Sequence, residues 1–155
     1  MDIKGDKMKE MKYISYEEYI TQKYYMKSEL LGKGTYKNYK WLIISYKTHP
    51  CAYIVSNEND LIYNKHYNDI YFVDVHGGLT YSEWGLGDYI GNDKWVIGWD
   101  YAHYGDYLPY SPSETDKKWT TEEIYENIKD AINNIIEESE RNERKCEFRN
   151  KVINV

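Results

Sequence analysis

The sequence predicts an α+β protein of one domain, with a mainly antiparallel sheet and a helix at each end of the chain. Several short apolar runs follow one another between residues 40 and 100 without helical segments between them, and strands joined without helical crossovers pair antiparallel. Isoleucines then recur at helical spacing after residue 120. The length of 155 residues suits a single core.

The first predicted element is a helix over residues 13–32. Ser15 is placed to cap it, and Glu17 and Glu18 suit the positive end of a helix dipole. Gly32 is typical of the position just after a helix. The N-terminal helix is therefore expected to end there.

The middle of the chain is predicted to form the sheet. Apolar runs indicate strands at residues 40–47, 51–56, 70–76 and 94–100, while residues 77–84 either continue the third strand or return as a further one. Pro50 fits a turn rather than a central strand. Residues 57–69 and 85–93 are polar or glycine-rich and are expected to be loops.

The strongest helical signal closes the chain. Thr120 and Glu123 form the capping-box pattern T-x-x-E. One apolar stripe follows, made of Ile124, Ile128, Ile132, Ile135 and Ile136. Such a stripe is expected to pack on one face of the sheet. The pattern gives way to charge after Arg141, and residues 152–155 are expected to be a frayed end or a small added strand.

Composition narrows the functional classes. The net charge of −6 argues against non-specific nucleic-acid binding but permits a basic protein partner. No apolar run approaches the roughly 20 residues that cross a bilayer, and the N-terminus lacks a signal-like apolar region. A cytoplasmic protein without membrane contact is expected, with a flexible segment 1–12 ahead of a domain at 13–155. Cys51 and Cys146 are expected to be reduced packing residues.

Two segments carry candidate chemistry. VDVHGGLTYSEWG (73–85) and WVIGWDYAHYGDY (95–107) each begin as an apolar run and end in a polar turn that contains histidine and glycine. The candidate ligand-binding or motif residues are His76, Gly77, Gly78, Thr80, Tyr81, Asp100, His103 and Asp106. Two such turns at neighbouring strand ends are expected to bring the histidines and aspartates together.

Imidazole and carboxylate groups are ligands of catalytic metals, but no HExxH-type signature is present, so neither a metal nor a cofactor is assigned. The alternative is that these groups only satisfy hydrogen bonds at strand ends. Gly77 and Gly78 would then supply a turn with positive φ.

The same motifs resemble a family of small proteins found in phages, prophages and bacteria. In that family an HGG[IL]TY segment is followed by Wx[ILF]GFDxxHxGD and a C-terminal helix. The match covers about residues 51–138, with Trp99 in place of the usual phenylalanine. The predicted helix at 13–32 lies outside it. The resemblance implies a phage context and therefore a protein that counters bacterial immunity.

Three functions remain open at this point. The first is an anti-defence inhibitor that binds an immune effector such as a CRISPR nuclease complex, with partner contacts through Tyr16, Tyr19, Tyr24 and Tyr25. The second is a sponge that binds a nucleotide defence signal by aromatic stacking. The third is a metal-dependent hydrolase using the two histidine motifs. The acidic, tyrosine-rich composition favours binding over catalysis, without deciding whether the protein is an enzyme.

Overall fold

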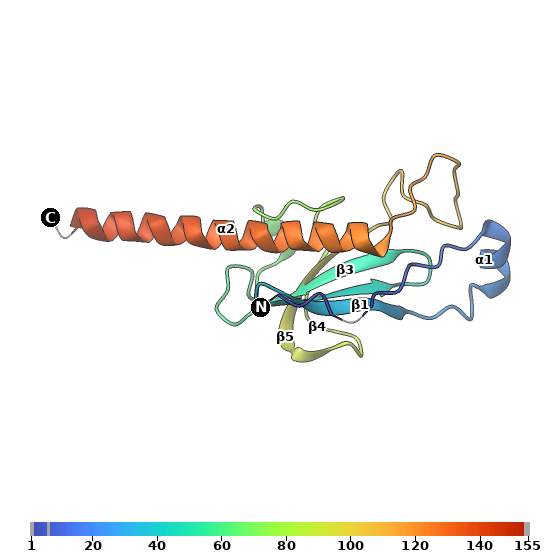
Figure 1. The fold of residues 1–155 in the computed structure, drawn as a ribbon, viewed down its shortest axis with the longest axis horizontal. Helices are drawn as coiled ribbons and strands as arrows, with labels where there is room; N and C mark the ends of the chain where they lie inside the picture. Colours follow the sequence, from blue (N-terminus) through green and yellow to red (C-terminus); the bar gives the residue numbers. More distant parts are fainter. Residues whose placement is uncertain (1, 6, 154–155) are drawn as a thin grey trace.

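A computed structural model describes residues 2–5 and 7–153 and confirms the α+β class (Figure 1). Five antiparallel strands form one sheet, and a long C-terminal helix lies across one of its faces. The elements, in chain order, are α1 (Tyr16–Gln22), β1 (Glu29–Tyr36), β2 (Tyr39–Ser45), β3 (Pro50–Val55), the 3₁₀ turn η1 (Tyr67–Asp69), β4 (Tyr81–Leu86), β5 (Ile90–Asp100) and α2 (Thr121–Ile153).

The strand order is β1-β2-β3-β5-β4, so the last strand along the chain lies inside the sheet. β5 pairs with β3 on one side, where Cys51 lies opposite Asp100, and with β4 on the other side. β5 is therefore paired on both sides as far as Gly98, close to its end at Asp100. The second histidine motif leaves the sheet from a fixed strand end.

The isoleucine stripe of α2 packs on the sheet as predicted. Ile124, Ile128, Ile132 and Ile135 are completely buried. They belong to one core with strand residues such as Trp41, Ile43, Ala52, Ile54, Ile97 and Trp99. The capping box is also present, because Glu123 N–H donates to Thr120 Oγ1 at 3.1 Å while Glu123 Oε1 accepts from Thr120 N at 2.9 Å.

The opposite face of the sheet has a second core, built from strand and hairpin side chains. Its buried members include Leu42, Ile44, Cys51, Tyr53, Val55, Leu86, Ile90 and Val96. The two edges of the sheet approach each other there. The Ser28 hydroxyl, next to the edge strand β1, is 3.0 Å from the Tyr89 hydroxyl, in the turn between β4 and β5. The sheet is thus curved around this second core.

The predicted helix at 13–32 is wrong in length. α1 covers only Tyr16–Gln22, with Ser15 as its cap, and the following apolar residues belong to β1. β1 was missed because its apolar positions, Leu30 and Leu31, sit in a polar and glycine-rich stretch. Pairing with the apolar run of β2 outweighs the local helical preference.

The predicted strand at 70–76 is also wrong, since this segment is a loop. Ile70 and Val73 are buried in the α2-side core, and Asp74 N–H donates to Asn134 Oδ1 of α2 at 3.1 Å. The segment therefore packs beside the helix without a strand partner. The loop predicted at residues 85–93 is shorter in the structure, because β4 continues to Leu86 and β5 starts at Ile90.

Two smaller points concern the ends of β3 and α2. Pro50 is the first residue of β3, a place in a strand that proline tolerates. α2 continues through Ile153 and extends well past the sheet (Figure 1), so residues 152–153 are helical, while 154–155 lie outside the described residues. Neither α1 nor α2, the helices of the described ranges, has the length and apolarity that a membrane crossing requires.

The N-terminal segment lies along β1. Ile3 and Thr35 exchange two backbone hydrogen bonds of 2.7 and 2.6 Å, and Lys9 N–H donates to Leu31 O at 2.7 Å. Met11 is buried in the α2-side core. These contacts cover the outer side of β1 at two points.

Candidate functional site

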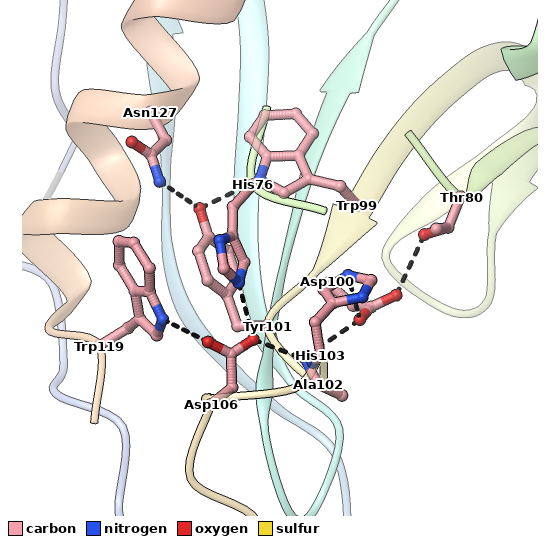
Figure 2. A network of polar contacts seen from close by, with 10 residues as sticks. All are labelled: His76, Thr80, Trp99, Asp100, Tyr101, Ala102, His103, Asp106, Trp119 and Asn127. Atoms are coloured by element: carbon pink, nitrogen blue, oxygen red, sulfur yellow. Dashed lines mark hydrogen bonds and ion pairs between the residues drawn. The ribbon is translucent and has the colours of Figure 1, made fainter. Parts of the chain in front are cut away.

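Four candidate residues of the two motifs come together at one end of β5, namely His76, Asp100, His103 and Asp106 (Figure 2). His76 Nε2 is 2.7 Å from Asp106 Oδ2, and His103 Nε2 is 3.2 Å from Asp100 Oδ1. The two imidazole rings meet edge to face with centroids 5.4 Å apart. The convergence expected from the paired motifs is therefore present.

Asp106 is the centre of this network. Its side chain is 3% exposed, and its Oδ2 accepts from both His76 Nε2 and the His103 backbone N–H, the latter at 2.9 Å. Its Oδ1 accepts from Trp119 Nε1 at 2.9 Å. Burial alone would raise the pKa of Asp106, but these donors together lower it below its ordinary value. Asp106 is thus held as a carboxylate.

Asp100 forms the second half of the network at the last residue of β5. It accepts from Thr80 Oγ1 and from the Ala102 backbone N–H, each at 3.1 Å. The 3.2 Å approach of His103 Nε2 has ion-pair distance without hydrogen-bond geometry. Asp100 therefore ties the turn after β5 to the segment that leads into β4.

Gly77 is required beside His103. Its φ is +70°, in the left-handed region. A Cβ built on Gly77 would lie 2.2 Å from His103 Nε2. The first motif thus approaches the second so closely that no side chain fits between them. Gly78 also has a positive φ, but open space surrounds its Cβ position.

Three further side chains complete the network, and none of them was among the candidate residues predicted from the sequence: Tyr101, Trp119 and Asn127. His76 stacks on Tyr101 with ring centroids 5.2 Å apart and an interplanar angle of 9°. The Tyr101 hydroxyl accepts from Asn127 Nδ2 of α2 and from Trp99 Nε1. Trp119 packs on His76 with centroids 4.8 Å apart. Trp119 and Asn127 lie outside both motifs, and their spacing in the sequence gives no signal of this role.

The contacts of Asp106 fix the orientation of the His76 imidazole. Within residues 2–5 and 7–153, no group of three or more histidine, cysteine, aspartate or glutamate side chains is placed to hold a metal ion. Both Asp106 oxygens already accept hydrogen bonds. His76, whose side chain is 26% exposed, is the imidazole that Asp106 holds in place.

Tyr81 is separated from this network. It belongs to β4 and packs against the second core, on the sheet face opposite α2. Its hydroxyl donates to Gly85 O at 2.8 Å. Cys51 lies nearby on that face, and burial raises the pKa of its thiol to about 12. Such a thiol stays protonated near neutral pH, which agrees with a packing role for Cys51.

The four tyrosines expected to contact a partner lie in and after α1. Tyr16, Tyr24 and Tyr25 are exposed, whereas Tyr19 is partly buried with its ring centroid 5.8 Å from that of Tyr110. These residues do not join the histidine network. The structure therefore separates the two sets of candidate residues, one at the end of β5 and one around α1.

Comparison of the chain with protein-family models, with curated proteins and with solved structures finds no match in any of the three.

Proposed function

We propose that this protein is a phage- or prophage-type anti-defence protein that binds and inhibits a bacterial immune effector, such as a CRISPR nuclease complex. The observation that carries the proposal is an exposed apolar surface, called here the tyrosine surface, made of Tyr16, Ile20, Tyr24 and Tyr25. Tyr24 and Tyr25 are 83% and 82% exposed, and α1 has no buried residue. Exposed clusters of large apolar side chains are typical of interaction sites.

The tyrosine surface is attached to the body of the protein by specific contacts just before α1. Tyr13 donates its hydroxyl hydrogen to Trp119 O at 2.8 Å, and Tyr107 donates to Ile14 O at 2.6 Å. Figure 1 places α1 at the end of the molecule away from the C-terminus. The backbone that leads into α1 is therefore fixed to the body of the protein, which lowers the cost of ordering this segment when it binds.

Charge and motif context support the choice of partner. The net charge of −6 favours encounter with basic surfaces, which nucleic-acid-handling complexes present. The phage context comes from the resemblance of the two histidine motifs. In this proposal the histidine network holds the fold together and takes no part in catalysis.

The experiment uses bacterial strains that each carry one immune system, a CRISPR nuclease system among them. Each strain is infected with a phage that its system targets, in the presence or absence of the protein. Wild type is expected to restore phage plating on at least one strain. The Tyr24→Ala/Tyr25→Ala variant is expected to lose this protection, because removal of two contact anchors weakens binding by roughly tenfold or more.

Two matched variants separate partner contact from other effects. Tyr71→Ala removes a tyrosine that is also 83% exposed but lies outside the tyrosine surface, and it should protect like wild type. A folded His76→Ala/His103→Ala variant should also keep protection. If no strain is protected by wild type, or if the folded histidine variant is inactive and only wild type degrades a nucleotide signal, the proposal is wrong.

A further inference from the structure

A pocket of about 380 Å³ opens on the sheet face opposite α2. Its walls include Tyr46, Tyr53 and Tyr81, with His49, Cys51 and Asp100 as its polar lining. This volume lies within the usual range for small-molecule sites. The pocket contains none of the residues of the tyrosine surface, so a ligand site here is independent of the proposed function.

Gly98 of β5 makes the aromatic wall possible. In the sheet register Gly98 lies between Tyr53 of β3 and Tyr81 of β4. A Cβ on Gly98 would come within 2.4 Å of the Tyr53 ring and 2.7 Å of Ala52 O. The missing side chain therefore leaves room for the Tyr53 ring beside β5. A glycine inside a strand normally weakens the strand, so this position has a packing reason.

The three tyrosine rings stand at steep angles to one another. Tyr53 and Tyr81 meet edge to face, with centroids 5.3 Å apart and an interplanar angle of 85°. Tyr46 and Tyr53 are 6.3 Å apart at 74°. Rings packed edge to face in this way form one continuous aromatic wall of the pocket. Their faces carry negative electrostatic potential, which attracts organic cations.

The charge of the pocket points to the same class of ligand. Among the described residues, Asp100 is the one carboxylate of the lining, and no lysine or arginine contributes to it. Burial lowers the pKa of His49, which favours its neutral form, and the Cys51 thiol is protonated near neutral pH. The Asp100 side chain is 27% exposed. Its Oδ2 accepts from Thr80, while its Oδ1 accepts from the Ala102 backbone N–H and lies by His103. A carboxylate has about four acceptor sites, so capacity remains for a ligand.

We propose that this pocket binds a small alkylammonium compound, with the aromatic wall on one side of the cation and the Asp100 carboxylate on the other. A phosphate-bearing ligand would bring negative charge against Asp100 without a basic side chain of the described lining to compensate. The pocket is thus a site for a cation at the end of β5 where the histidine network begins, and Asp100 belongs to both.

The test measures binding of three probes to the full chain by nuclear magnetic resonance titration. The probes are choline, its uncharged tert-butyl analogue and adenosine monophosphate. Choline is expected to shift the amide signals of Cys51, Gly98 and Asp100. The uncharged analogue should bind roughly tenfold more weakly, because it has the same shape without the charge that the rings and carboxylate attract.

Variants then assign the site. Asp100→Asn removes the charge, and Tyr46→Leu removes one ring at the rim. Each should weaken choline binding by roughly tenfold. Tyr36→Leu is the matched control, since Tyr36 is a partly buried tyrosine packed on the α2-side core, and it should bind choline as wild type does. Because Asp100→Asn also disturbs the histidine network, the Tyr46 variant keeps the test informative if the first one unfolds.

Each other result contradicts the proposal in a defined way. Equal binding of choline and the tert-butyl analogue would mean an apolar pocket without cation selectivity. Binding of adenosine monophosphate instead of choline would mean a nucleotide site. Absence of binding by all three probes, or choline binding that survives both variants, would remove this pocket as an ammonium site. None of these results bears on the tyrosine surface.

Discussion

Asp106 shows how a buried charge is accommodated at the residue scale. Its carboxylate accepts hydrogen bonds from an imidazole, an indole and a backbone amide. Each donor comes from a different part of the chain, since His76 precedes β4, His103 follows β5 and Trp119 precedes α2. The carboxylate therefore joins three segments that lie outside the strands and helices.

Replacement of Asp106 by asparagine tests this role. We expect Asp106→Asn to lower the free energy of unfolding by about 2–3 kcal/mol at neutral pH, because the amide loses charge-assisted hydrogen bonds and brings donors of its own to a site filled with donors. Chemical denaturation would measure the difference. Asp88→Asn, in the exposed β4–β5 turn, is the control and should change stability little.

The same carboxylate predicts a pH dependence. The pKa of Asp106 in the folded protein is below its ordinary value of 3.8. Its stabilising contribution is therefore complete above about pH 4 and is lost as the pH falls through the lower, folded-state pKa. The stability gap between wild type and Asp106→Asn should narrow in that acidic window. A gap of constant size from neutral pH down to about pH 2 would contradict the assignment.

The residues of this network illustrate what the sequence reveals about a site. His76, Asp100, His103 and Asp106 were predictable as a group because two similar turns follow two apolar runs. Trp119 and Asn127 were not, since a side chain that arrives from another element leaves no spacing pattern. The pocket residue Gly98 is similar, because its importance appears only once β3 and β4 are seen on either side of it.

At the scale of elements, α2 contributes a row of fully buried isoleucines to the α2-side core. We expect Ile128→Ala or Ile132→Ala to lower the free energy of unfolding by about 2–5 kcal/mol, because both side chains are completely buried and their loss leaves a cavity. Thermal or chemical denaturation would measure it. Ile153→Ala, at the exposed end of the same helix and 77% accessible, should stay within about 0.5 kcal/mol of wild type. Equal effects at both ends would contradict this packing.

The elements were predictable where their patterns are strong and independent of partners. α2 has both a capping box and a long apolar stripe at helical spacing, and the second half of β5 is an apolar run of strand length. The predictions for the β1 residues and for segment 70–76 were wrong for opposite reasons. Leu30 and Leu31 form a strand only because β2 lies beside them, whereas Ile70 and Val73 resemble a strand but are buried beside α2 instead.

At the scale of the whole molecule, stability should be uneven along α2. Glu138 is the last buried residue of α2. The helix continues to Ile153 with exposed side chains such as Phe148. We expect amide hydrogens after residue 140 to exchange with solvent much faster than those of residues 124–135, because a helix segment without packing opens locally. Hydrogen exchange followed by mass spectrometry would show it. Uniform protection along α2 would mean that another surface covers its end.

The strip of chain before α1 has a consequence for how the protein behaves when shortened. Its peptide groups pair with those of Leu31 and Thr35 on the outer side of β1. A chain that starts after Met11 would leave those groups free to pair with another molecule, and an uncovered strand of this kind is a common origin of self-association. Removal of the first residues, or fusion of a bulky tag to them, is therefore expected to lower solubility without changing either candidate site. A tag on the far end of α2 would leave this protection in place.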